Sequence, residues 1–175
     1  MDTSSPRDTL LGFLADSKQF IQDYRLQNTG ENTYQAFRRA SHVLDFSTTP
    51  EGDSWFVRSR CIALLQELLA RIELSPASEI PGDREIADGT ISQWSIPNTN
   101  ISIARITQGV QAGQFLFSAE TVKQLDRLYR QAKRLPYRPG ATPGIYEELL
   151  ISDARMNVQE RQVRDRLKPI DTSSP

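Results

Sequence analysis

The sequence predicts a mainly helical α+β domain, in which antiparallel helices pack on a small three-stranded antiparallel meander. Apolar residues recur at helical spacing through most of the first half of the chain. Between about residues 90 and 118 the period changes to that of strands, in short runs rich in β-branched and aromatic residues. Helical spacing then returns as far as about residue 150. Because a small sheet is stable only against an apolar layer, we expect one of its faces to cover the helical half.

The helical half contains three predicted helices. The first begins after Ser5, which can cap it, and Pro6 suits its first position. A second, shorter helix is expected at about residues 32–43. We expect a third helix to begin at Pro50, with Thr49 as its cap. This third helix carries the strongest apolar stripe in the chain, formed by Trp55, Ile62, Leu65, Leu69 and Ile72.

The second half is predicted to hold a loop, the sheet and further helices. Residues 75–89 are rich in Pro, Gly, Ser and Asp, which indicates a loop. In the middle strand Arg105 lies on the same face as Ile103, so it either reaches water at the strand end or pairs with a buried carboxylate. Ser118 is expected to cap a helix over about residues 119–134. The runs that predict the strands are TISQWSIP, NISIARIT and GQFLFS.

The sequence indicates one globular domain at residues 3–150, followed by a connecting segment. Its expected parts are a helical part at about 5–74, a sheet at about 90–118 and helices at about 119–150. Residues 151–170 are rich in charge and predict a connecting segment. The pentapeptide DTSSP occurs at residues 2–6 and again at 171–175, so we expect the second occurrence to begin another unit of a tandem repeat.

Composition excludes several classes of protein. The formal net charge is −1 and hydrophobic residues make up 38% of the chain, which is typical of a folded domain and not of a general nucleic-acid binder. No apolar run approaches the roughly 20 residues of a membrane span, so a soluble chain is predicted. The single cysteine, Cys61, cannot form an internal disulfide.

Residues of catalytic type are not arranged as a catalytic or metal site. His42 is the only histidine and has neither a nearby cysteine nor the spacing of a zinc site, so we interpret it as a polar helix end. The acids at 83–88 do not follow the spacing of a calcium loop. Glu147 and Glu148 are adjacent and therefore diverge on a helix, which predicts an exposed face. The sequence thus predicts no catalytic residue, cofactor or metal.

Two groups of residues are candidates for contact with a partner or ligand. A basic stripe recurs at helical spacing after Ser118, and it is either an ordinary solvated face or a surface for anionic lipid headgroups. A pocket between the sheet and the helices could instead bind a small molecule. The basic stripe comprises Lys123, Arg127, Arg130 and Arg134. The residues that would line the pocket are Trp94, Arg105 and Tyr137. The aromatic group of Trp94, Phe115 and Phe117 is either core or a platform for a sugar or peptide.

The strand block carries a resemblance to a known family. Its sequence is WSIPNTNISIARITQGVQAGQFLFSAETV, from Trp94 to Val122, and it is followed by LPYRPG and GIYEELL. It resembles the extracytoplasmic region that precedes the membrane helices in bacterial mechanosensitive channels of the small-conductance (MscS-like) family. The stretches TSSPRDTLLGFL and LLQELLARIELSP look like the start and the long helix of that region, so the resemblance extends from Thr3 to about Leu150. The membrane helix, pore-lining helix and cytoplasmic β domain of a channel have no counterpart in this sequence.

The resemblance implies a non-catalytic module on the extracytoplasmic (periplasmic) side of a bacterial membrane, which acts in assembly, envelope contact or modulation of the channel. The implied partners are the membrane-embedded channel domain of the same parent chain, neighbouring repeats, envelope components and anionic lipid headgroups, but not nucleic acid. A small-ligand-binding sensor domain is the alternative function. A cell-wall hydrolase is a further alternative, although no set of acid, base and nucleophile can be assembled from the spacing of the residues.

Overall fold

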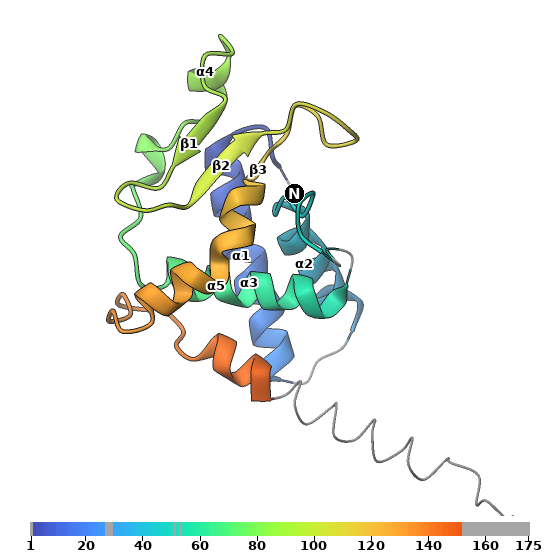
Figure 1. The fold of residues 1–175 in the computed structure, drawn as a ribbon, viewed down its shortest axis with the longest axis vertical. Coiled ribbons are helices and arrows are strands. Elements are labelled where there is room, and N and C mark those ends of the chain that lie inside the picture. The colour runs from blue at the N-terminus through green and yellow to red at the C-terminus, as the bar shows by residue number, and fades with distance from the viewer. Residues whose placement is uncertain (1, 27–29, 51, 53, 152–175) are drawn as a thin grey trace, which may run out of the picture.

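The computed structural model describes residues 2–26, 30–50, 52 and 54–151 and has the predicted α+β architecture, mainly helical with a three-stranded antiparallel meander. Helices α1, α2, α3 and α5 pack together, with α5 crossing in front of α1 in Figure 1, and the sheet lies across one end of them. The elements are α1 (Pro6–Arg25), α2 (Glu31–His42), α3 (Trp55–Leu69), η1 (Ala77–Glu79), α4 (Asp83–Ile86), β1 (Gln93–Ser95), β2 (Ser102–Arg105), β3 (Phe115–Phe117) and α5 (Ala119–Ala132). Residues 145–151 are also helical.

The first helix begins as its sequence predicts. The Ser5 side chain accepts a hydrogen bond from the Asp8 backbone N–H at 3.2 Å, and Pro6 occupies the first helical turn. This arrangement satisfies one of the N–H groups that an α-helix leaves unpaired at its start. The helix ends at Arg25, and α2 returns beside it to form a helical hairpin.

The predicted start of the third helix was wrong. Helix α3 begins at Trp55, with Ser54 at the cap position, and not at Pro50. Pro50 instead lies in a series of tight turns, in which the Thr49 N–H donates to the Phe46 carbonyl and the Gly52 N–H donates to the Thr49 carbonyl. A Thr-Pro pair suits a turn as well as a helix start, and the turns postpone the helix by about one turn.

The loop predicted at residues 75–89 contains two short helices, η1 and α4, that the sequence analysis missed. Glu85 Oε2 accepts a hydrogen bond from the Gly82 N–H at 2.8 Å, which caps α4. Arg7 of α1 binds the same region, since its backbone N–H donates to the Pro81 carbonyl and its Nε to the Ile80 carbonyl, both at 3.0 Å. A helix of four residues is too short to show an apolar period, so only these contacts reveal it.

The sheet has the predicted order, with β1 paired to β2 and β2 to β3, all antiparallel. Ile103 lies opposite Trp94 on one side and Phe117 on the other. Ile103 is fully buried, whereas Arg105 at the end of β2 is exposed and reaches water, which was the first of its two predicted environments. Phe115 and Phe117 are both fully buried, so they belong to the core and do not form a platform.

The outer edge of β3 is paired with segments from far away in the chain. The Phe115 N–H donates to the Thr3 carbonyl and its carbonyl accepts from the Thr9 hydroxyl, at 2.8 and 2.6 Å. Leu44 forms an isolated parallel bridge with Phe117, and the Phe117 N–H donates to the Val43 carbonyl at 2.8 Å. The backbone groups of β3 are therefore satisfied on both of its sides.

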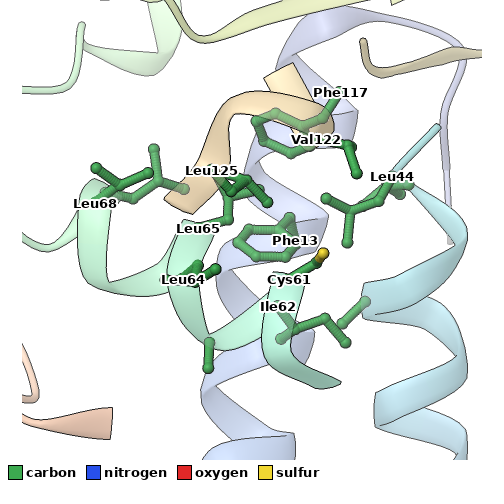
Figure 2. Packing of buried hydrophobic residues seen from close by; sticks show 14 of the residues in the cluster. Phe13, Leu44, Cys61, Ile62, Leu64, Leu65, Leu68, Phe117, Val122 and Leu125 are labelled. Carbon is green, nitrogen blue, oxygen red and sulfur yellow. The ribbon is translucent and has the colours of Figure 1, made fainter. Parts of the chain in front are cut away.

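The core lies where α1, α3, β3 and α5 meet, as Figure 2 shows for a set of its buried residues. Phe13 of α1 and Phe117 of β3 pack edge to face, with their ring centroids 5.3 Å apart. Leu65 of α3 and Leu125 of α5 fill the space beside them. Full burial of each such side chain contributes about 1.5–3 kcal/mol. The expectation that the sheet covers the helical half is confirmed.

The last described helices follow the prediction closely. Ser118 caps α5 by accepting from the Thr121 N–H at 3.1 Å, and the helix ends at Ala132, slightly before the predicted residue 134.

Within the part of the chain that the structure describes, no helix is both long and apolar enough to cross a bilayer. The predicted connecting segment at 151–170 lies outside the described residues apart from Ile151, and the repeat start at 171–175 lies outside them entirely.

Candidate functional site

The most unusual local chemistry in the described chain is a buried charged cluster at the C-terminal end of α3. We call it the Glu67 cluster, and it consists of Glu67, Arg71 and Tyr137. Glu67 is on α3 and is fully buried, while Arg71 is only 9% exposed and lies one helical turn further along. Tyr137 is half-buried and comes from the loop that follows α5. Charged residues are almost never this deeply buried unless they are paired, and here they pair with each other.

Hydrogen bonds connect all the members of the cluster. The Arg71 guanidinium donates to the Glu67 carboxylate and to the Tyr137 hydroxyl, and it also binds the Glu67 carbonyl at 2.8 Å. The Tyr137 hydroxyl donates to Glu67 Oε2 at 2.8 Å and accepts from the Gly144 N–H at 2.9 Å. The Ile145 N–H donates to the second oxygen, Glu67 Oε1, at 2.6 Å. Both carboxylate oxygens are therefore engaged by donors.

The aromatic rings add to the electrostatics of the cluster. The Arg71 guanidinium lies 3.8 Å from the centroid of the Tyr137 ring and 5.7 Å from that of Tyr129, within the range of cation–π attraction. Burial by itself would lower the pKa of Arg71, but the hydrogen bond and charge of Glu67 outweigh it and raise this pKa. Burial and the adjacent Glu67 carboxylate raise the pKa of Tyr137, although the Gly144 N–H opposes the change. Arg71 is thus held charged and Tyr137 neutral.

The Glu67 cluster fastens the end of the described chain to the core helix. It holds the loop after α5 through Tyr137 and the start of the last helix through the Gly144 and Ile145 N–H groups. Arg138 strengthens the same connection, since its backbone N–H donates to the Ala70 carbonyl at 2.8 Å and its guanidinium binds the Leu69 carbonyl. With Glu67 sealed from water, this arrangement is suited to fixing the chain and not to exchanging protons with a substrate.

The residues predicted to line a ligand pocket are not brought together. Trp94 is half-buried on β1 and packs against the core, and Arg105 is exposed at the end of β2. Tyr137 lies beyond the far end of α5, which begins beside the sheet and extends about 20 Å away from it (Figure 1). The three side chains therefore cannot bind one small molecule together.

The predicted basic stripe does form one surface. Lys123, Arg127, Arg130 and Arg134 are all exposed, the first three on α5 and the last just beyond its end. The apolar residues of the same helix face α3 and the sheet, so the stripe points away from the core.

Two adjoining cavities lie beside the end of α2, and we call them together the α2 groove. Their volumes are about 500 and 660 Å³, and both are lined by Ser41, His42 and Arg58. His42 is exposed, as the sequence predicts for a helix end, and its Nε2 lies 3.0 Å from Gln114 Oε1. Arg58 binds the Gly52 carbonyl at 2.7 Å and lies over the Phe46 ring. No sequence pattern indicated this groove, because it forms between segments that are distant in the chain.

Glu67 and Arg71 were missed by the sequence analysis, although a signal for them exists. Helix α3 is buried on most of its circumference, so its few charged positions have little access to water. A Glu and an Arg four residues apart on such a helix face the same side and can pair.

Among the described residues, no group of three or more His, Cys, Asp or Glu side chains is placed to hold a metal ion.

Comparisons with models of protein families, with curated proteins and with solved structures found no match to this chain.

Proposed function

We propose that this chain is a non-catalytic extracytoplasmic module of a mechanosensitive-channel-related membrane protein, which acts in assembly, envelope contact or modulation of the channel. The sequence resemblance supports the proposal, and its most specific stretch, Trp94 to Val122, comprises all of the sheet except Gln93, together with the first turn of α5. That stretch supplies buried residues to the core, including Ile96, Ile103 and Phe117. The resemblance thus falls on residues that build a scaffold.

The observation that carries the proposal is the way the Glu67 cluster fastens the last described helix to α3. One way for a module to modulate a neighbouring membrane domain is to transmit a displacement through its chain connection. Here the segment at 145–151 is held by the buried hydrogen bond from the Ile145 N–H to Glu67 and by apolar contacts of Ile145, Tyr146 and Leu149, which are all buried. A force applied to the chain beyond residue 151 would therefore act on the core helix.

Sequencing the parent reading frame on both sides of this chain is the first test. The proposal expects apolar segments of about 20 residues on at least one side. In the second step, patch-clamp recordings compare the parent protein with a version from which residues 3–150 are deleted. A shift in the tension needed for opening, or a loss of assembly, supports the proposal. A parent without membrane segments, or one that assembles and opens identically without the module, overturns it.

A ligand-binding sensor is the second candidate function, and the α2 groove is the observation that favours it. Arg38, Arg39 and His42 line the groove, so it suits a small anionic molecule. Titration calorimetry with inorganic phosphate, citrate and nucleoside monophosphates would detect such binding. If binding occurs and is lost in Arg38→Gln/His42→Gln, the sensor function is favoured over the structural module. If none of these anions binds, the sensor proposal loses its support.

A further inference from the structure

Helix α5 carries three basic side chains on its outer side and a fourth follows just beyond its end, and we call the four together the α5 basic face. It consists of Lys123, Arg127, Arg130 and Arg134, and all four are exposed. At 100° per residue the three positions on α5 fall within an arc of about 60°. The opposite side of the helix is buried and holds Thr121, Val122, Leu125, Leu128, Tyr129 and Ala132.

The acidic residues of α5 form no ion pair with this face. Asp126 points toward α3, where its Oδ1 binds the Arg60 guanidinium at 2.6 Å. Glu120 accepts a hydrogen bond from Gln124. Arg127 donates to Gln124, and across the described ranges no salt bridge links a carboxylate to any member of the α5 basic face. The four cations are therefore free of ion pairs within the described residues, and the acid on the same side of the helix is Glu120, one turn before Lys123.

The shape of the face restricts its possible partners. From Lys123 to Arg130 the row extends about 10 Å along a helix that its buried side holds to the core, and Arg134 follows beyond the end of the helix. Tyr129, the one aromatic residue of α5, is buried, so the face offers no ring on which a nucleic-acid base could stack. The large apolar side chains that are exposed in the described part of the chain all lie outside α5. A straight, polar row of cations suits a flat anionic surface.

We propose that the α5 basic face docks on the anionic headgroups of a phospholipid bilayer. This inference rests on the proposed function, which places the chain beside a membrane, and it names the side of the module that faces the lipid. Because no large apolar side chain is exposed on α5 and a single one, Leu135, follows Arg134, docking is electrostatic and does not insert a helix face into the hydrocarbon.

The expected strength follows from the number of charges. Each basic side chain near an anionic bilayer raises the partition coefficient about fivefold, so four raise it several hundredfold. The Debye length falls from about 10 Å at 0.1 M salt to about 3 Å at 1 M, and binding should disappear over this range.

The test is co-sedimentation of the purified chain with vesicles of phosphatidylcholine that contain either none or 30% phosphatidylglycerol. The variant Lys123→Gln/Arg127→Gln/Arg130→Gln/Arg134→Gln removes the face, and Gln keeps the helix propensity of Lys and Arg. The matched control, Lys18→Gln/Arg25→Gln/Arg84→Gln/Arg105→Gln, removes the same charge from exposed positions outside α5 and outside the α2 groove. Circular dichroism verifies that both variants are folded.

The inference predicts binding only to the anionic vesicles, a loss of at least a hundredfold in the α5 variant, and a change of no more than a few fold in the control. Absence of binding by the natural chain overturns it, as does equal loss in the two variants or binding that survives 1 M salt. Poly-glutamate provides the last comparison. If it binds the face as tightly as vesicles at equal charge concentration, the partner is an acidic polymer and the membrane assignment is overturned. None of these outcomes decides the proposed function, which is tested on the parent protein.

Discussion

Replacing Arg71 by Met tests whether the Glu67 cluster holds the last helix to α3. The substitution retains apolar volume but removes the guanidinium that binds the Glu67 carboxylate, the Glu67 carbonyl and Tyr137. Glu67 is fully buried and would keep only the Tyr137 hydroxyl at 2.8 Å and the Ile145 N–H at 2.6 Å. Removing one partner of a buried ion pair leaves an uncompensated charge and costs about 3–5 kcal/mol.

Urea unfolding and thermal melts, both followed by circular dichroism, measure this loss. For a chain of this size each kcal/mol lowers the Tm by about 2–4 °C, so Arg71→Met should lower it by about 6–20 °C. The control is Arg39→Met, which breaks the surface pair between Arg39 and Asp16 and should cost less than about 1 kcal/mol.

The double variant Glu67→Met/Arg71→Met provides a second test, which still applies if Arg71→Met alone does not fold. Its stability is compared with that of the single variant. With both charges removed no unpaired carboxylate remains, so the double variant should recover part of the lost stability. If Arg71→Met costs no more than Arg39→Met, or if the double variant is at least as unstable as the single one, the buried pair does not have the role assigned to it.

Three further predictions concern a cap, a thiol and the core. Ser5→Ala removes the cap of α1 and should lower the free energy of unfolding by about 1 kcal/mol in urea titrations; no change would contradict the capping role. Burial raises the pKa of Cys61 from 9.0 to about 11, so at about pH 8 the thiolate is about a hundredfold scarcer than in the unfolded chain, and Ellman's reagent should react at least that much more slowly without urea than with it. Because the pKa of the folded state is the higher one, this thiol favours folding below about pH 9 and loses that contribution as the pH rises toward 11; Cys61→Ala should lack this part of the pH dependence. Leu65→Ala should cost about 2–5 kcal/mol by leaving a cavity between α3 and α5, whereas the exposed Leu11→Ala should cost well under 1 kcal/mol.

The features that could be predicted are those fixed by neighbouring residues. The start of α1 depends on Ser5, Pro6 and Asp8, and the cap of α5 depends on Ser118 and Thr121, so both were found from local patterns. The strands were found because their alternating β-branched and aromatic residues contrast with the helical period around them.

The features that were missed depend on contacts between distant segments. The turns around Pro50 satisfy the same local preferences as a helix start, and α3 begins at Trp55, whose ring packs on Phe37 and Phe20 of distant segments. Burial of Glu67 depends on donors that come from residues 137–145, which no local pattern places beside α3. Tyr137 was named as a candidate contact residue, but its partners belong to the interior and not to a ligand pocket.

The paired outer edge of β3 has a consequence for folding during synthesis. Thr3 and Leu44 leave the ribosome long before Phe115 and Phe117, with which they pair. Helices α1 to α3 therefore emerge with the side that later covers Phe117 still exposed. The Phe13 ring in particular remains uncovered until Phe117 has been synthesised and packs against it. Closure of such long loops is slow compared with helix formation, so the nascent helical half spends part of its existence with an uncovered apolar surface. A chaperone that shields this surface until about residue 118 has emerged would raise the yield of folded chain, and truncation before β3 would leave the helices prone to aggregation.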